Sequence, residues 1–315
     1  MPARQKIIID TDPGQDDAVA ILLALASPEQ LDLLGVVAVA GNVPLSFTAT
    51  NARKVLELGG RPDLPVHAGC RRPMLRLPRT AEYVHGPTGL NGPDLPDPKM
   101  PLGPQHGVDW LIDTVEAHAP GTITLCTLGP LTNIAMAFVK APDLPGRLKR
   151  IVMMGGGCFE AGNVTPAAEF NIYVDPEAAD VVLRSGVPIT MLPLDLTHQV
   201  LSTPERIAAI RALGNRTGQA VADMLTFSEA FDRKKYGWPG APLHDPNVIA
   251  WLLAPDLYQG REINVTVETA SLLTLGATVA DWWRVTDRPR NVLYLRDVDA
   301  KGFYALLLKR LGRLP

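Results

Sequence analysis

Four aspartates are concentrated in the segment DTDPGQDD near the start of the chain: Asp10, Asp12, Asp16 and Asp17. An apolar run at 7–9 precedes this segment, and an apolar helical run at 18–26 follows it. Like charges gathered at a strand-to-helix turn repel one another unless a cation neutralises them. Because a set of oxygen ligands suits a hard divalent ion, the segment predicts a Ca²⁺ or Mg²⁺ site.

A simpler interpretation is that Asp16 and Asp17 cap the helix while Asp10 and Asp12 lie in solvent. A cap needs one acidic side chain rather than four, so we favour the metal site. Pro and Gly at 13–14 supply the turn, because Pro fixes φ and Gly tolerates unusual backbone angles. The free N–H groups of the helix N-terminus also favour carboxylates there.

Two further polar groups of residues could take part in chemistry. Asn163, Glu169 and Asn171 lie together in sequence and could bind a sugar diol, although local side-chain-to-backbone bonds explain such a loop equally simply. His244 and Asp245 open an apolar helical run at 248–253. Asp at a helix start is commonly a cap, whereas a histidine with a pKa near neutrality can protonate a leaving group.

Composition narrows the class of protein. The chain has 315 residues, a net charge of −3 and no long basic cluster, which argues against nucleic-acid binding. No apolar stretch approaches the roughly 20 residues that span a bilayer. The three cysteines are widely spaced, which fits reduced thiols better than disulfides or a zinc site. The first residues lead directly into a strand, so we expect no signal peptide, no membrane partner and a cytoplasmic location.

Strand-like and helix-like runs alternate along the chain, and this alternation positions the polar residues. Strands are predicted at 6–11, 33–40, 65–68, 122–127, 150–154 and 187–192, and helices at 16–25, 45–58, 108–118, from 131, and at 175–184. Helices then dominate 204–253, followed by strand-like runs at 262–268, 272–279 and 291–296 and a helix at 300–311. The pattern predicts an α/β fold: a single, Rossmann-like domain over 1–315 with a mainly parallel central sheet flanked by helices.

Polar residues follow several of the predicted strands. The aspartate segment, Asn42, Leu128 and Met154 all come at or just after strand ends. Ligands bind outside the carboxyl ends of strands in open parallel sheets, so these turns should form one pocket rim. Residues 71–105 are rich in Pro, Gly and charge without a regular period, which indicates either a functional loop or a surface insertion.

Taken in order, these motifs resemble the inosine-uridine preferring nucleoside hydrolases. The matching segments are 10–20, 41–42, 128–133, 152–156, 162–163, 168–171, 175–177 and 244–246, so the resemblance covers nearly the whole chain. It implies the nucleoside hydrolase fold and hydrolysis of the N-glycosidic bond of ribonucleosides to free base and ribose, with a tightly bound Ca²⁺. It also implies a homodimer or homotetramer.

The resemblance further implies roles for individual residues. Ca²⁺ would be held by Asp12, Asp17, the backbone carbonyl of Leu128, and Asp245. Asp12 would also be the general base for the attacking water, and Asp10 would support the metal site from behind. The ribose would be bound by Asp16, Asn42, Asn163, Glu169 and Asn171, with Met154 lining the sugar pocket. His244 would face the leaving base.

The expected reaction explains why such groups are needed. Cleavage passes through a sugar with oxocarbenium character, so positive charge builds on the ribose while the base departs. Ca²⁺ acidifies water only weakly, so a carboxylate base such as Asp12 must complete the deprotonation, contributing about 10²- to 10⁴-fold. A base that leaves as an anion needs a proton, which we assign to His244.

The base pocket is the least defined part of the prediction. It should be built from 83–91 and 227–242, where His85 could contact a pyrimidine. Four aromatic residues could stack on a base or belong to the core: Phe227, Phe231, Tyr236 and Trp238. His244 favours a pyrimidine-specific or nonspecific enzyme, so uridine and cytidine are the expected substrates, with inosine a further candidate.

Two other functions remain open from the residues. A Mg²⁺ phosphatase of the haloacid dehalogenase type also begins with a strand ending in Asp-x-Asp, but its later Lys and acidic pair are not found here. A nucleoside-binding protein without activity could share the scaffold. The chain also lacks the GxGxxG, GxxxxGK[ST], GxSxG and HExxH motifs, which disfavours dinucleotide-binding, phosphate-loop, serine hydrolase and zinc protease functions.

Overall fold

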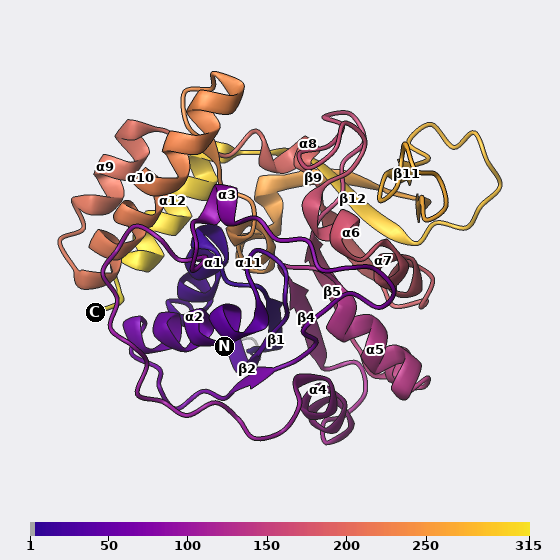
Figure 1. Cartoon of the computed structure of the whole chain (residues 1–315), viewed down its shortest axis with the longest axis horizontal. Helices are drawn as coiled ribbons and strands as arrows, with labels where there is room; N and C mark the ends of the chain where they lie inside the picture. The colour runs from indigo at the N-terminus through magenta and orange to yellow at the C-terminus, as the bar shows by residue number, and fades with distance from the viewer. Residues whose placement is uncertain (1–3) are drawn as a thin grey trace.

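The computed structural model describes residues 4–315 and has an eight-stranded sheet at its centre (Figure 1). Across the sheet the strands are β3 (Val66–Ala68), β2 (Leu31–Ala38), β1 (Gln5–Thr11), β4 (Ile123–Thr127), β5 (Arg150–Met154), β6 (Ile189–Leu192), β12 (Val292–Val298) and β9 (Tyr258–Ile263). Every neighbouring pair is parallel except β12 and β9. The predicted α/β fold with a mainly parallel sheet is therefore confirmed.

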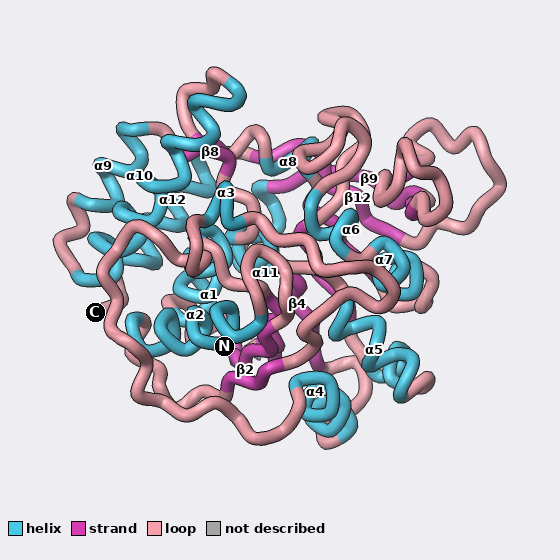
Figure 2. Tube along the Cα trace, in the orientation of Figure 1, coloured by secondary structure: helices cyan, strands magenta, loops and turns pink. Residues whose placement is uncertain are grey.

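Helices cover both faces of this sheet, as Figure 2 shows. One face is packed by α1 (Gln15–Leu25), α2 (Leu45–Leu58), α9 (Pro204–Arg211), α10 (Arg216–Tyr236), α11 (Pro246–Leu253) and α12 (Ala300–Leu311). The other face is packed by α4 (Gly107–Glu116), α5 (Thr132–Lys140) and α7 (Pro176–Leu183). Three short helices lie near the carboxyl ends of the strands: α3 (Glu82–His85), α6 (Phe170–Val174) and α8 (Leu194–Thr197).

The central strand β1 shows why its sequence is a continuous apolar run. Ile7 and Ile9 pack into the core under α1, whereas Ile8 packs into the core on the opposite face. A strand covered on both faces needs apolar residues at every position, and all three isoleucines are fully buried. Polar residues occupy only the two ends of the strand, Gln5 and Lys6 at its start and Asp10 and Thr11 at its carboxyl end.

The predicted strand at 272–279 is wrong. Leu272 and Leu273 lie in turns and are exposed, and only β11 (Thr278–Ala280) is a strand, paired with β10 (Val265–Val267). Figure 1 shows β11 beyond the edge of the main sheet, whereas Val265 of its partner β10 packs into the core beside α7. An apolar run predicts a strand only if something buries it. The predicted strand at 262–268 is likewise divided between β9 and β10.

The irregular segment at 71–105 contains only α3 and otherwise has no helix or named strand. Two very short strands that the sequence did not predict, β7 (Leu201–Ser202) and β8 (Ala241–Pro242), pair near the cavity described below. Two residues are too few to show a period. The expectation that no signal peptide precedes β1 concerns residues 1–3, which lie outside the described part of the chain.

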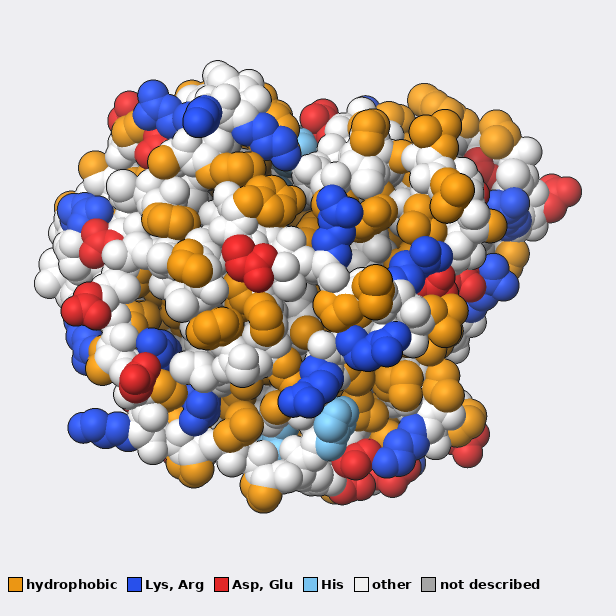
Figure 3. All heavy atoms as spheres, in the orientation of Figure 1, with side chains coloured by type: hydrophobic (Ala, Val, Ile, Leu, Met, Phe, Trp, Pro, Cys, Tyr) orange, Lys and Arg blue, Asp and Glu red, His pale blue; other side chains and the backbone are white. Residues whose placement is uncertain are grey.

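In the view of Figure 3, acidic and basic side chains are interspersed and no single sign of charge dominates the visible face. Within residues 4–315, we find no helix with the length and apolar character that crossing a bilayer requires.

Candidate active site

The aspartate segment connects β1 to α1 at the carboxyl edge of the sheet. Asp17 accepts hydrogen bonds from the Thr11 hydroxyl and from the backbone N–H of Gly14 at 2.9 Å, so it does cap the helix. Asp12 has a different environment. Its Oδ2 accepts the backbone N–H of Asn42 at 2.7 Å, whereas its Oδ1 is buried without a partner in the part of the chain that the structure describes.

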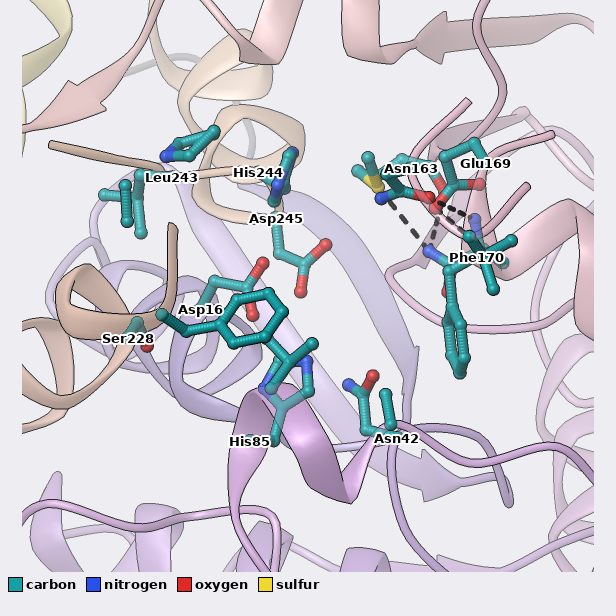
Figure 4. A pocket seen from close by; sticks show the side chains of 18 of the residues that line it. Asp16, Asn42, His85, Asn163, Glu169, Phe170, Ser228, Leu243, His244 and Asp245 are labelled. Carbon is teal, nitrogen blue, oxygen red and sulfur yellow. Dashed lines mark hydrogen bonds between the residues drawn. The ribbon is translucent and has the colours of Figure 1, made fainter. Parts of the chain in front are cut away.

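Three further carboxylates meet beside Asp12. Oxygen atoms of Asp16, Asp17 and Asp245 lie within 4.8 Å of one another, although Asp245 comes from the start of α11 (Figure 4). Burial, reinforced by the charges of neighbouring acids, raises the pKa of Asp12 and Asp245 and raises that of Asp17 to about 6. Buried carboxylates crowded in this way require a positive partner.

The types of ligand atom at the site indicate which positive partner fits. The available groups are carboxylate and carbonyl oxygens, one of which is an unpartnered buried oxygen of Asp12. A hard divalent cation with oxygen ligands fits this set, so this is a candidate metal site. The predicted metal ligands include Asp12. The three acids whose oxygen atoms approach one another most closely include Asp16 instead.

Two other residues predicted at the metal site lie at its border. The carbonyl of Leu128 accepts the side-chain amide of Asn171 at 2.7 Å and retains a second lone pair. Asp10 is fully buried, and its Oδ2 accepts the side-chain amide of Asn133 at 2.7 Å. Burial raises the pKa of Asp10 to about 8, so this carboxyl group holds a proton near neutral pH.

The second polar cluster forms the opposite wall of the same cavity. Glu169 caps α6, and its carboxylate accepts the backbone N–H groups of Gly156 at 2.9 Å and of Asn171 at 3.0 Å. The side-chain oxygen of Asn163 accepts the N–H of Phe170 at 2.9 Å. Burial raises the pKa of Glu169 to about 7. The local bonds that seemed an alternative to sugar binding are present, and they fix these side chains in the cavity wall.

One cavity brings together residues from widely separated parts of the sequence. Ten of the predicted site residues line it: Asp16, Asn42, His85, Leu128, Met154, Asn163, Glu169, Asn171, His244 and Asp245. Figure 4 shows Asp16 and Asp245 facing one another, with Asn163 and Glu169 across the cavity. Asp10, Asp12 and Asp17 are fully buried beneath it. The structure thus brings the predicted site into one place.

The histidine at this site differs from the expectation. Nδ1 of His244 lies 2.7 Å from the hydroxyl of Thr197, a residue that the sequence gave no reason to select. Burial, with smaller effects from His198 and His85, lowers the pKa of His244 to about 3. This pKa lies well below the near-neutral value expected from the residue type, because the cavity wall shields the ring from solvent and favours its neutral form.

The aromatic residues divide into two groups. Phe231 and Tyr236 line the cavity, as does Tyr83, which lies 5.8 Å from Phe231 between ring centroids. Phe227 and Trp238 are not among the lining residues; Trp238 instead stacks on Tyr236 with ring centroids 4.6 Å apart. Two of the four predicted aromatic residues therefore reach the candidate base pocket.

Comparison with known proteins agrees with this geometry. The family described as inosine-uridine preferring nucleoside hydrolase matches residues 7–305. The chain belongs to this family. A pyrimidine-specific ribonucleoside hydrolase, RihA, of Photobacterium profundum is 48% identical over 307 residues, covering 97% of this chain and 98% of that protein. An uncharacterized protein of Schizosaccharomyces pombe is 58% identical over 310 residues, covering 98% and 100%.

Solved structures extend the agreement to the fold. A purine-preferring ribonucleoside hydrolase from Gardnerella vaginalis superposes with a TM-score of 0.91 at 32% identity, covering 98% of each chain. The resemblance inferred from the motifs is therefore confirmed, and the chain is a ribonucleoside hydrolase. This membership excludes the binding protein without activity and favours nucleoside cleavage over the phosphatase.

Proposed function

We propose that this nucleoside hydrolase is a Ca²⁺-dependent enzyme that cleaves the N-glycosidic bond of pyrimidine ribonucleosides, releasing free base and ribose. The observation that carries the proposal is the unpartnered buried oxygen of Asp12 beside the acids of α1 and Asp245. Uridine and cytidine are the proposed substrates because the RihA relative, at 48% identity, is pyrimidine-specific, and inosine is a further candidate.

We assign the ion to Asp12, Asp17, the carbonyl of Leu128, and Asp245. When bound, Ca²⁺ would supply a fixed positive charge that orients the sugar diol and makes the attacking water more acidic. Asp16 lies close enough to share in holding either the ion or the diol.

Asp12 is the proposed general base. Its Oδ2 is occupied by the N–H of Asn42, so Oδ1 is the atom that accepts a proton from water. The water oxygen then bonds to C1′ of the ribose, and the electron pair of the broken C1′–N bond leaves with the base. A positioned base of this kind contributes about 10²- to 10⁴-fold.

The wall opposite the acids would bind the sugar. Asn42, Asn163, Glu169 and Asn171 offer donors and acceptors to the ribose hydroxyls, and Met154 provides an apolar surface. Several of these side chains are held by backbone N–H groups, so they cost little ordering when the ribose binds. Contacts that strengthen as the ring flattens accelerate the reaction.

His244 is the proposed donor to the leaving base. Because the ring is neutral, it must donate from Nε2–H, which requires the Thr197 hydroxyl to donate to Nδ1. The Nε2–H group stabilises the departing anionic base through a hydrogen bond. The neutral ring keeps its proton, because losing it would leave an imidazolate, and solvent protonates the base after release. His85, Phe231 and Tyr236 would surround the base, with the aromatic rings offering flat apolar faces.

We further propose one nucleoside hydrolase domain over residues 1–315 that forms a homodimer or homotetramer in the cytoplasm. The family resemblance supports the assembly, and the cysteines, which are all free in the structure, support the compartment. Light scattering behind size exclusion measures the number of subunits directly.

A substrate panel tests the function. The purified chain is incubated with uridine, cytidine, inosine, adenosine and p-nitrophenyl phosphate, with Ca²⁺ or with a chelator. We expect base release from uridine and cytidine that is lost with the chelator and restored by Ca²⁺. Phosphate release with intact nucleosides would contradict the reaction. Faster release from inosine than from either pyrimidine nucleoside would contradict the preference.

A further inference from the structure

Gln15, the first residue of α1, is almost completely buried although its side chain carries polar atoms. Its side-chain Nε2 donates to two backbone carbonyls, those of His85 and Asn91, each at 3.1 Å. Its Oε1 lies 2.7 Å from Nδ1 of the His85 ring. One amide side chain therefore contacts both the backbone and the ring of a residue that lines the candidate base pocket.

These contacts fix which way the amide of Gln15 faces. Both carbonyl oxygens can only accept, so the nitrogen of the amide must point to them and the oxygen must point to the ring. The reverse orientation would place the amide oxygen against two carbonyl oxygens. An amide oxygen cannot donate, so the hydrogen between Oε1 and the ring must belong to Nδ1 of His85.

The ring of His85 is also held by close packing. A Cβ built on Gly14 would come 2.4 Å from Nδ1 and 2.8 Å from Cε1, so this edge of the ring lies directly on the glycine backbone. Nε2 makes no hydrogen bond with the side chains or backbone that the structure describes. Burial lowers the pKa of His85 to about 4, so the ring is neutral near pH 7. A neutral ring with its hydrogen on Nδ1 presents a bare lone pair at Nε2.

We infer that Gln15 is a positioning residue that holds His85 in the Nδ1–H tautomer, so that Nε2 accepts a hydrogen bond from an N–H group of the nucleobase. The base, rather than the sugar, is the proposed donor because α3 places His85 beside the aromatic pair Tyr83 and Phe231, whose rings suit a planar ligand. The identity of this ligand rests on the proposed function, whereas the tautomer does not.

The chain offers a matched control in Asn51, another buried amide. Its Nδ2 donates to the carbonyl of Pro13 at 3.0 Å and to that of Thr88 at 2.7 Å. Asn51 therefore ties the same loop to the same turn as Gln15 does, but no hydrogen bond joins it to the His85 ring. A change that merely loosens the loop should appear in both variants, and a change in the tautomer only in the Gln15 variant.

The first test reads the tautomer by NMR in the full-length, Ca²⁺-loaded enzyme without substrate. Two-bond ¹H–¹⁵N correlations of ¹⁵N-histidine protein distinguish bare from protonated ring nitrogens, and His85→Gln assigns the signal. We expect Nδ1–H and bare Nε2 in the wild type and in Asn51→Leu, and mixed tautomers in Gln15→Met. Nε2–H in the wild type, or an unchanged tautomer in Gln15→Met, would overturn the inference.

A second variant covers the case in which Gln15→Met does not fold. A Gln15→Glu side chain that stays protonated in this buried site donates its O–H to the carbonyls and keeps an acceptor oxygen toward the ring, so it should keep the Nδ1–H tautomer. A His85 ring without a hydrogen on Nδ1 in Gln15→Glu would overturn the inference that residue 15 sets the tautomer.

Kinetics then separate positioning from general structural damage. Gln15→Met should lower kcat/KM for uridine about three- to tenfold, the size of one hydrogen bond, and affect p-nitrophenyl riboside less because its leaving group has no N–H. In a His85→Gln background the same change should have no further effect, whereas additive losses would show that Gln15 acts independently of the ring. If the wild type cleaves no ribonucleoside, the proposed function fails while the NMR result still decides the role of Gln15.

Discussion

The backbone N–H of Asn42 donates to Oδ2 of Asp12 at 2.7 Å, while Oδ1 of the same carboxylate is buried and unpartnered among residues 4–315. One oxygen is thus fixed by the protein, and the other is left for a ligand. A buried carboxylate oxygen without a partner is unfavourable in a folded protein. Its presence indicates that this position serves chemistry rather than stability.

The first prediction concerns this oxygen. Asp12→Asn keeps the shape of the side chain but removes the charge and the basic oxygen, so we expect kcat for uridine to fall about 10²- to 10⁴-fold. Circular dichroism should show an unchanged fold. Asp63→Asn is the control, because Asp63 pairs with Arg61 at the surface and should leave kcat unchanged. Wild-type turnover by Asp12→Asn would show that another group activates the water.

The second prediction uses the glycines that surround the same carboxylate. A Cβ on Gly129 would come 2.2 Å from Oδ1 of Asp12, so Gly129→Ala must displace the proposed base. A displacement of about 1 Å can cost about 10²-fold in rate, and we expect a loss of that order in kcat. The control is Gly146→Ala, where an added Cβ meets nothing within 4 Å. Equal rates for the two variants would show that Asp12 need not hold its place.

The sequence predicted much of the fold because the signals were local and redundant. Buried strands such as β1 are continuous apolar runs, and the residues after them collect at one edge of a parallel sheet. The same logic failed at Leu272 and Leu273, where an apolar run lies in an uncovered loop. The sequence pattern shows which residues are apolar, but only the tertiary structure decides whether another element buries them.

The candidate site divides in the same way. The DTDPGQDD segment and Asp245 were identified from residue type, and the structure brings three of these acids together. The contacts of Gln15 and Thr197 were not predicted, because their importance lies in which side-chain atom faces which neighbour. The low pKa of His244 was missed for a related reason, since burial is not visible in one residue's identity.

The third prediction links Ca²⁺ affinity to pH. Burial and neighbouring acids raise the pKa of Asp12 and Asp245 and raise that of Asp17 to about 6, so the metal-free enzyme holds protons that Ca²⁺ must displace. Affinity should therefore increase as pH rises from 5 to 8. Calorimetry in buffers of different ionisation enthalpy should detect proton release on binding, and the part due to Asp17 should diminish above pH 6. Affinity independent of pH would contradict the assignment.

The raised pKa of Asp17 also affects the stability of the metal-free enzyme. Asp17 has a raised pKa in the folded protein, so the unfolded chain ionises first and the metal-free enzyme loses stability as pH rises from about 4 to about 6. Ca²⁺ binding should reverse this loss, adding about 2.7 kcal/mol at 100 times its dissociation constant. Urea unfolding with and without Ca²⁺ at pH 5 and pH 8 measures the difference, which should be larger at pH 8.

The fourth prediction concerns the leaving group. His244→Ala removes the proposed hydrogen-bond donor to the leaving base, so we expect kcat for uridine to fall about 10²- to 10³-fold. The loss with p-nitrophenyl riboside should be much smaller, because p-nitrophenolate leaves without a proton. Equal losses on both substrates would remove His244 from this role.

Thr197→Val tests how the neutral ring of His244 can act on the leaving base. The hydroxyl of Thr197 lies 2.7 Å from Nδ1 of His244, and its donation to Nδ1 places the hydrogen on Nε2. Valine keeps the shape but cannot donate, so the ring loses its preferred tautomer, and uridine turnover should fall several-fold while p-nitrophenyl riboside is spared. Burial lowers the pKa of His244 to about 3, so this ring does not titrate between pH 6 and 7. The pH–rate profile in that range should therefore have the same shape in the wild type and in both variants. An imidazolium titrating in that range, lost in His244→Ala, would show instead that the charged ring is the donor.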